Sequence, residues 1–205
     1  MNLNHWISEY LKAQTAALQS VPPLAIEGIV RLLAEAVAND RQVFVFGNGG
    51  CGAIASHFAC DLGKGASNAL GLRFRVRSLN DNMPWITAIA NDHGYEDIFW
   101  RQLEGHARPG DLAFALSVSG KSPNIVSAVK WCAAHQLRTV ALVGAGEGSV
   151  AQLADTVISM PEKHFGRVED VYMTRVVEKD GKPVNSVFET IPHQHDPWKD
   201  DHPTN

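Results

Sequence analysis

The fold of this chain is decided by residues 43–62, VFVFGNGGCGAIASHFACDL. The first four residues form an apolar, β-favouring run, which is typical of a strand covered on both faces of a parallel sheet. Residues 47–52 form a glycine-rich turn, and residues 53–62 are rich in helix formers. A strand, a turn and a helix in this order aim free backbone N–H groups and the positive end of the helix at one place. The stretch therefore predicts a binding site for an anion, above all a phosphate.

Titratable residues lie in and just beyond this turn. His57 and Asp61 are four positions apart, which places them on one face of the predicted helix. The spacing leaves three interpretations open: a pair of metal ligands, a general acid and base, or an ordinary ion pair. Cys51 begins the helix, and we interpret it as a small neutral hydrogen-bond donor, because a thiolate would repel a phosphate.

A second turn in the same order of strand, turn and helix lies at residues 117–122, SVSGKS. It follows an apolar run and precedes Pro123, a residue favoured in the first turn of a helix. Ser117, Ser119 and Ser122 can donate hydroxyl hydrogen bonds to phosphate oxygens. A helix cap would need only one of these serines, so the presence of three favours a ligand. Two such turns at one edge of a parallel sheet indicate a single phosphorylated ligand.

The glycines of the first turn also match the dinucleotide-binding pattern GxGxxG, at Gly47, Gly49 and Gly52. That pattern expects an acidic residue about twenty positions further on, at the end of the second strand. Here the second predicted strand ends near Asp81, too far along the chain, and a serine-rich second turn is not part of the pattern. We therefore disfavour a nicotinamide or flavin cofactor.

Predicted strands and helices alternate along the rest of the chain. Besides 43–46, we predict strands at 74–79, 112–117, 139–143 and 156–160, helices at 84–90, 95–106, 124–135, 150–153 and 165–176, and a loop at 63–72. This alternation predicts an α/β fold with a five-stranded parallel sheet covered by helices on both faces. Helices predicted at 3–19 and 24–38 form an N-terminal helical layer, whose apolar stripes pack either on this sheet or on another subunit.

The composition argues against several classes of protein. A net charge of −4 gives no general reason to expect binding to nucleic acid or to an anionic membrane, and no apolar run reaches membrane-spanning length. Arg73, Arg75 and Arg77 alternate with apolar residues, and we interpret them as the solvated side of an edge strand. The N-terminus is too polar for a signal peptide, and the three cysteines lack zinc or redox spacing. We therefore expect reduced thiols and a cytoplasmic protein.

Several motifs occur together: GNGG at 47–50, HFA at 57–59, AND at 90–92 with DIF at 97–99, GD at 110–111, SVSGKS at 117–122 and GRVED at 166–170. In combination they resemble the SIS (sugar isomerase) domain, and more narrowly its phosphoheptose isomerase branch, which includes the replication regulator DiaA. The resemblance covers residues 1–175 and leaves 176–205 as a divergent C-terminal extension that we expect to be partly mobile. It implies a three-layer α/β/α sandwich with a flavodoxin-like sheet, and a homotetramer with sites between subunits.

The resemblance also implies a substrate, sedoheptulose 7-phosphate, and zinc as the metal bound by several members. The implied substrate-binding residues are Asn48, Gly49, Gly50, Cys51, Asp92, Ser117, Val118, Ser119 and Ser122, of which the serines hold the phosphate. The implied metal ligands are His57, Asp61 and Glu169, and the same three residues are the implied catalytic residues. The family has a histidine two turns after Glu169, and here that residue is Val177.

Isomerisation between an aldose and a ketose moves a proton between adjacent carbons through an enediol. We predict a phosphosugar isomerase of this kind, with Asp61 or Glu169 as the base and with His57 and Zn²⁺ polarising the substrate oxygens. Two alternatives remain open: a non-catalytic phosphosugar-binding protein, which Val177 suggests, and a partner of a replication initiator, like DiaA. The expected partners are a sugar phosphate and further copies of the chain, and neither nucleic acid nor a membrane.

Overall fold

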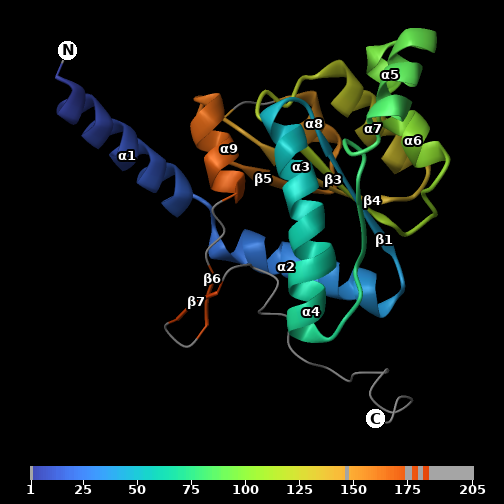
Figure 1. The fold of residues 1–205 in the computed structure, drawn as a ribbon, viewed down its shortest axis with the longest axis horizontal. Coiled ribbons are helices and arrows are strands. Elements are labelled where there is room, and N and C mark those ends of the chain that lie inside the picture. Colours follow the sequence, from blue (N-terminus) through green and yellow to red (C-terminus); the bar gives the residue numbers. More distant parts are fainter. Residues whose placement is uncertain (1, 146–147, 174–176, 180–181, 185–205) are drawn as a thin grey trace.

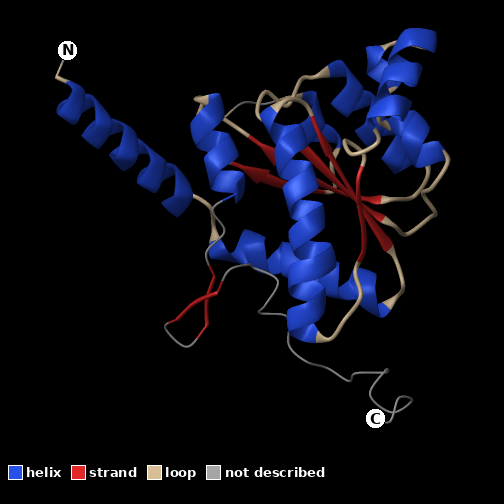
Figure 2. Ribbon diagram, viewed as in Figure 1, coloured by secondary structure: helices blue, strands red, loops and turns tan. Residues whose placement is uncertain are grey.

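The computed structural model describes residues 2–145, 148–173, 177–179 and 182–184. At its centre lies a five-stranded parallel sheet with the strand order β2-β1-β3-β4-β5 (Figure 1). The strands are β1 (Gln42–Gly47), β2 (Arg75–Ser78), β3 (Leu112–Ser117), β4 (Arg138–Val143) and β5 (Thr156–Ser159). Helices cover both faces of the sheet, which confirms the predicted three-layer α/β/α fold (Figure 2).

The central strands supply two hydrophobic cores, because successive residues of a strand point to opposite faces. Val43 and Val45 face one core, which they share with α2 (Pro23–Ala38), α3 (Gly50–Cys60) and α9 (Phe165–Met173). Phe44 and Phe46 face the other core, which they share with α5 (Met83–Asp92), α6 (Trp100–Glu104), α7 (Pro123–Ala134) and α8 (Ser149–Leu153). All four side chains are fully buried. The continuous apolar run of β1 thus reflects burial on both faces.

Residues 61–70 are helical, so the prediction of a loop over 63–72 was wrong. Helix α3 continues into a π-helix, η1 (Asp61–Ala66), and then into α4 (Ser67–Leu70). Leu62 and Leu70 are buried in the core that α3 shares with the sheet, so tertiary packing outweighs the low helix propensity of Gly63 and its neighbours. The wide π turn also brings Gly63 close to β2, since a Cβ there would lie 3.0 Å from Val76 Cγ1.

Residues 95–106, predicted as one helix, are divided into a 3₁₀ turn, η2 (Tyr95–Asp97), and α6. Asp97 is the last residue of the 3₁₀ turn, and its side chain bonds two side chains of α6. Its carboxylate accepts hydrogen bonds from Trp100 Nε1 at 2.8 Å and from Arg101 Nε at 3.1 Å. Side chains three and four residues apart lie on one helix face, so these bonds tie the turn to α6. The apolar periodicity of the segment does not reveal the division.

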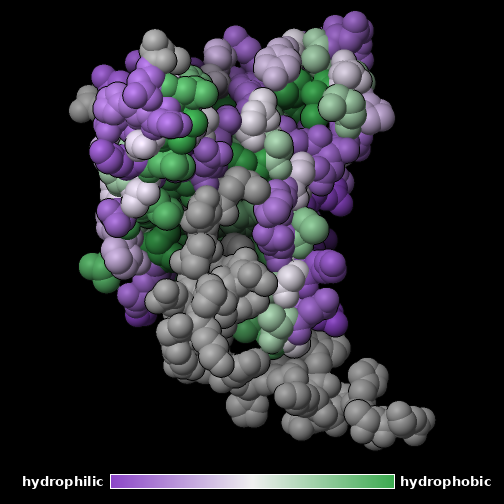
Figure 3. Space-filling view, turned by 60° about the vertical axis from the view of Figure 1, so that its left-hand side comes forward, coloured by the Kyte–Doolittle hydropathy of each residue, from purple (hydrophilic) through white to green (hydrophobic). Residues whose placement is uncertain are grey.

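Helix α1 (Leu3–Gln19) extends away from the sheet, whereas α2 packs on it (Figure 1). The predicted bounds of both helices are confirmed to within one residue. The contacts of α1 are with α9: Gln14 Nε2 donates to the Arg167 carbonyl at 3.4 Å, and the Tyr10 and His164 rings lie 5.9 Å apart between centroids. The apolar residues of α1 that remain exposed are Leu3, Trp6, Ile7, Leu11 and Leu18. Figure 3 brings this side forward and shows hydrophobic residues at the surface among hydrophilic ones.

After α9 the chain forms a small antiparallel hairpin of β6 (Val177–Lys179) and β7 (Lys182–Val184). Position 177 therefore belongs to a strand and not to a continuing helix. Apart from this hairpin, the extension that we expect to be partly mobile lies outside the described residues. None of the helices in the described part of the chain is both long enough and apolar enough to cross a bilayer.

The start of α9 is held by Glu162. Its carboxylate accepts hydrogen bonds from the backbone N–H groups of Lys163 and His164, both at 2.7 Å, and pairs with Arg167 Nε at 2.7 Å. Arg167 first, and then these N–H groups, lower the pKa of Glu162 from 4.5 to about 2. A carboxyl group with a lowered folded-state pKa stabilises the fold above its unfolded pKa, and this contribution is lost as the pH falls through the folded value.

We predict that Glu162→Gln lowers the free energy of unfolding at neutral pH by about 1–2 kcal/mol. The difference from the wild type should shrink as the pH falls from 4.5 to about 2, because the wild-type carboxyl group is then protonated too. Urea unfolding at a series of pH values measures this. The control is Glu9→Gln, which removes the exposed pair of Glu9 with Lys12 and should change little. A difference that stays constant over this pH range would contradict the prediction.

Candidate functional site

The two turns singled out in the sequence meet at one edge of the sheet. Strands β1 and β3 are parallel neighbours, with Gly47 opposite Leu116, so the turns that follow them leave the sheet side by side. The chain passes from β1 to β2 on one side and then returns to β3 on the other. This is the switch point of an open α/β sheet, where ligands bind beyond the carboxyl ends of the strands.

A reciprocal pair of amide side chains joins the two turns. Asn48, in the first turn, donates through Nδ2 to Asn124 Oδ1 at 2.9 Å, and Asn124, in the first turn of α7, donates back to Asn48 Oδ1 at 2.7 Å. Tyr95 adds a third contact, from its hydroxyl to Asn48 Oδ1 at 3.2 Å. The predicted convergence of the turns is therefore built into the structure by direct hydrogen bonds.

Asn80 fixes the first turn from the end of β2. Its side-chain amide bonds both backbone groups of Gly47: Nδ2 donates to the carbonyl at 2.8 Å, and Oδ1 accepts from the N–H at 3.2 Å. The turn leaves no room for a side chain at Gly52, since a Cβ there would lie 2.8 Å from Asn80 Nδ2. Gly49 has a φ of +55°, a conformation that glycine adopts without strain.

The second turn leaves its hydroxyl protons free to bind an anion. Ser117 Oγ accepts from the Gly120 N–H at 3.2 Å, and Ser119 Oγ accepts from the Lys121 N–H at 3.3 Å. Ser122 is the N-cap residue of α7, but its side chain makes no capping hydrogen bond. The predicted role of these serines as donors is consistent with these contacts, because a hydroxyl that accepts one hydrogen bond can still donate its own proton.

A cavity of about 520 Å³ opens beside the first turn. Its polar lining includes Asn48, Ser56, Asn80 and Tyr95, and its apolar lining comes mainly from α5 and from residues 98–99. A pocket with an apolar wall and a few polar groups that converge is the usual form of a small-molecule site. Sequence reasoning missed Asn80, Tyr95 and Asn124 as site residues, because nothing in their local spacing marks a partner far along the chain.

Cys51 and Glu169 meet at the start of α3. The thiol of Cys51 donates to Glu169 Oε1 at 3.9 Å and is bonded by the backbone of Val118. The carboxylate of Glu169 lies directly over Gly50, where a Cβ would collide with it. Burial, with a smaller contribution from Glu169, raises the pKa of Cys51 to about 11. The thiol is therefore neutral, in agreement with its interpretation as a donor.

Three of the predicted site residues lie apart from the turns. His57 and Asp61 pair with each other, Nε2 to Oδ2 at 2.9 Å, and both side chains are about half exposed. Asp61 follows the 11-residue helix α3, so about 16 Å of helix separate it from Gly50 at 1.5 Å per residue. Asp92, the last residue of α5, is exposed, and its carboxylate accepts from Asn91 Nδ2 at 2.8 Å.

The described residues do not form a complete zinc site. Among them, no three histidine, cysteine, aspartate or glutamate side chains gather closely enough to hold a metal ion. His57 and Asp61 supply two adjacent donors, whereas a structural zinc site uses four protein ligands and a catalytic site three. The third predicted ligand, Glu169, contacts Gly50 at the other end of α3.

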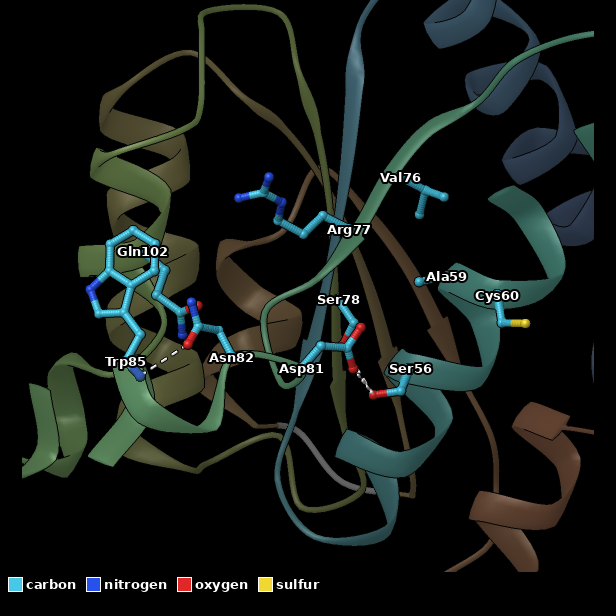
Figure 4. A pocket seen from close by; sticks show the side chains of 10 residues that line it. All are labelled: Ser56, Ala59, Cys60, Val76, Arg77, Ser78, Asp81, Asn82, Trp85 and Gln102. Carbon is cyan, nitrogen blue, oxygen red and sulfur yellow. Dashed lines mark hydrogen bonds between the residues drawn. The ribbon is translucent and has the colours of Figure 1, made fainter. Parts of the chain in front are cut away.

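A larger hollow, of about 690 Å³, lies along the outer edge of β2 between α3 and α5 (Figure 4). Ser56 donates to Asp81 Oδ1 at 2.5 Å, and Arg77 extends from β2 toward the side on which Trp85 lies. Arg75 and Arg77 are exposed on this edge strand, as predicted, and Arg73 is exposed just before it. The hollow contains no residue of either turn and shares Ser56 alone with the 520 Å³ cavity, which the first turn lines. We therefore place the anion site at the turns.

Comparison with known proteins agrees with this arrangement. The SIS domain model matches residues 8–144. The chain belongs to the SIS domain family. It is 35% identical over 169 residues to a phosphoheptose isomerase of Geotalea daltonii, with 82% of this chain and 86% of the relative covered. A phosphoheptose isomerase of Mycobacterium tuberculosis is 38% identical over 145 residues, with 70% and 72% covered.

The solved structures that this SIS protein resembles include a phosphoheptose isomerase from Francisella tularensis. The TM-score is 0.75 at 25% identity, and the match covers 84% of this chain and 92% of the other. A phosphoheptose isomerase from Neisseria gonorrhoeae gives the same TM-score at 24% identity, with 84% and 93% covered. The fold is therefore shared along nearly the whole length of these two proteins.

The cysteines give a direct test of the site's electrostatics. We predict that at pH 8 a thiol reagent modifies Cys60, which is exposed, about a hundredfold faster than Cys51 or Cys132. Burial raises the pKa of Cys51 to about 11 and that of Cys132 to about 12, so both are almost entirely protonated at that pH. Mass spectrometry of the labelled protein identifies the sites, and Cys60→Ser should abolish the fast phase. Labelling of Cys51 at the rate of Cys60 would contradict the prediction.

Proposed function

We propose that this protein is a phosphosugar isomerase that interconverts sedoheptulose 7-phosphate and the corresponding aldoheptose 7-phosphate. The observation that carries the proposal is the Asn48–Asn124 pair, because it brings the glycine turn and the serine turn together around one position. The choice of a heptose is supported by the phosphoheptose isomerases to which the chain is similar. The phosphate would lie at the second turn, where hydroxyl groups and the N-terminus of the 12-residue helix α7 favour an anion.

The reaction needs a base beside the two carbons that exchange a proton. The base removes a proton from C1 of the ketose while the C2 carbonyl oxygen takes up a proton, which gives the enediol. Return of a proton to C2 and loss of the O1 proton then give the aldehyde. We assign the base to Glu169, because its carboxylate contacts Gly50 and Cys51 in the first turn.

Asp61 is too far along α3 to reach a sugar bound at the start of that helix in the same chain, and His57 is paired with Asp61. An extended seven-carbon chain spans about 8–9 Å at roughly 1.5 Å per bond. About 16 Å of helix separate Asp61 from Gly50, the first residue of α3. We therefore propose that this pair completes the site of a second copy. A zinc ion would need donors from that copy or from residues outside the described part, and the proton transfers above do not depend on it.

The exposed apolar face of α1 supports an oligomer, which we propose to be a homotetramer. Leu3 and Leu11 are about 60% exposed and Trp6 is 51% exposed, on a helix that projects from the sheet. Large apolar side chains gathered on one projecting helix indicate contact with another protein surface. A symmetric oligomer supplies that surface through a second copy of the same helix.

A non-catalytic phosphosugar-binding protein is the second candidate. It is favoured by Val177, which stands where the family has a histidine and which begins the strand β6. Such a protein would be stabilised thermally by sedoheptulose 7-phosphate but would not convert it. The activity assay below therefore decides between the two candidates.

We predict that purified protein converts sedoheptulose 7-phosphate and that Glu169→Gln lowers kcat by about 10²–10⁴-fold, because the amide cannot accept the C1 proton. Asp61→Asn should also lose activity. If the two carboxylates of one site come from different copies, mixing the two inactive variants should restore about a quarter of the sites. Absence of conversion by the wild type would reject the isomerase, and absence of restoration would reject the shared site.

We also predict that Trp6→Glu with Leu11→Glu dissociates the oligomer, because each substitution places a charge in the buried apolar contact. Sedimentation velocity measures the change. Ser8→Glu adds the same charge at an exposed polar position of α1 and should leave the oligomer intact. A wild-type protein that sediments as a monomer at micromolar concentration would contradict the assignment of α1 to an interface.

A further inference from the structure

Asn124, in the first turn of α7, is more completely buried than any polar side chain of the glycine turn or the serine turn. It does not line the 520 Å³ cavity. It is 1% exposed, and hydrogen bonds engage both ends of its amide. Oδ1 accepts from the Ile125 backbone N–H at 3.0 Å and from Asn48 Nδ2 at 2.9 Å, while Nδ2 donates to Asn48 Oδ1 at 2.7 Å. A buried amide with these bonds has one orientation that satisfies them.

The backbone decides which orientation that is. The N–H of Ile125 can only donate, so the atom of Asn124 that faces it must be the oxygen. The nitrogen of Asn124 then faces Asn48, and the atom of Asn48 that it meets must in turn be an oxygen. The start of α7 thus orients Asn124, and Asn124 orients Asn48.

This chain of bonds determines what Asn48 presents to the cavity. Its Oδ1 accepts from Asn124 and from the Tyr95 hydroxyl, so both lone pairs are engaged. Its Nδ2 donates one proton to Asn124, and the second proton has no partner among the described residues. Asn48 lines the 520 Å³ cavity and therefore offers that cavity a donor and no acceptor.

We propose that Asn124 is a positioning residue that holds Asn48 as a hydrogen-bond donor to an oxygen of the bound sugar phosphate. The identity of that ligand rests on the proposed function, whereas the orientation of Asn48 does not. An oxygen of a phosphate, carbonyl or hydroxyl group accepts this bond. A ligand that placed an ammonium group there, such as an amino sugar, would face a second donor and be disfavoured.

The sharpest variant is Asn124→Asp, which keeps the size and the acceptor for Ile125 but removes the donor to Asn48. Asn48 is then free to turn its amide and present Oδ1 to the ligand. We expect KM for sedoheptulose 7-phosphate to rise about tenfold or more, with a much smaller change in kcat. Asn39→Asp makes the same substitution at an exposed helix C-cap and should leave KM unchanged.

A double-mutant cycle with Asn48→Ala separates positioning from a structural role. If Asn124 acts through Asn48, then Asn124→Asp should change KM by less than about twofold in the Asn48→Ala background. Full multiplication of the two effects would overturn the proposal, and so would an Asn124→Asp enzyme whose KM stays within about twofold of the wild type. The cycle is run on the dissociation constant if the wild type binds the sugar phosphate without converting it.

A measurement without ligand tests the positioning role of Asn124 independently of the proposed function. Side-chain amide NMR of ¹⁵N-labelled protein should show two well-separated, slowly exchanging proton signals for Asn48 in the wild type. In Asn124→Asp those signals should shift and exchange faster, while circular dichroism stays unchanged. Asn48 signals that are alike in the two proteins would refute the positioning role even if the enzyme is an active isomerase. Loss of isomerase activity alone would leave the orientation result standing.

Discussion

The parallel pairing of β1 with β3 is the constraint on which the rest of the structure depends. It sets Gly47 opposite Leu116, so that two turns separated by about seventy residues leave the sheet next to each other. Everything polar in the site is attached to this junction. Asn80 holds the end of β1 from the neighbouring strand, and Asn124 holds the first turn from α7. Without the pairing, Asn124 would have no partner in the first turn.

Neutral dipoles dominate the contacts within this junction. The side chains that hold the turns are amides and hydroxyls, and the thiol of Cys51 remains protonated because burial raises its pKa to about 11. Such groups donate to an anion without a cost for burying an unpaired charge. Glycines at this junction let neighbouring groups approach the backbone closely, because glycine has no Cβ. Gly50 lies beneath the carboxylate of Glu169, and Gly120 meets Gly148 of the next turn backbone to backbone.

The layered fold and both turns were predictable, because burial leaves periodic signals in the sequence. The bounds of β3 were predicted without error, and those of α1 likewise. The errors fall where tertiary contacts outweigh local preference. Buried Leu62 and Leu70 keep 61–70 helical in spite of its glycines, and the helix predicted over 95–106 is divided into η2 and α6.

The predicted site residues show the same difference between roles set by local sequence and roles set by distant contacts. Residues whose role follows from the backbone of a turn lie where we expected them: Asn48, Gly49 and Gly50 in the first turn, and Ser117, Ser119 and Ser122 in the second. Asn80 and Asn124 were missed because their partners are far away in the sequence, and a lone asparagine has no pattern. His57 and Asp61 share a helix face as predicted, yet helix spacing says nothing about distance from the second turn.

The distance of Asp61 from the start of α3 limits which carboxylate can act within one chain. A helix rises 1.5 Å per residue, so Asp61, eleven residues beyond Gly50, lies about 16 Å along the helix from a sugar bound at the start of α3. Within one chain, Glu169 is the carboxylate that contacts the first turn, because α9 crosses the start of α3 and places it over Gly50. The proposed neighbouring copy would account for both the exposed His57–Asp61 pair and the exposed face of α1. Assembly and catalysis would then depend on each other, since the same contact that buries the apolar helix would bring the second pair of titratable groups to the sugar.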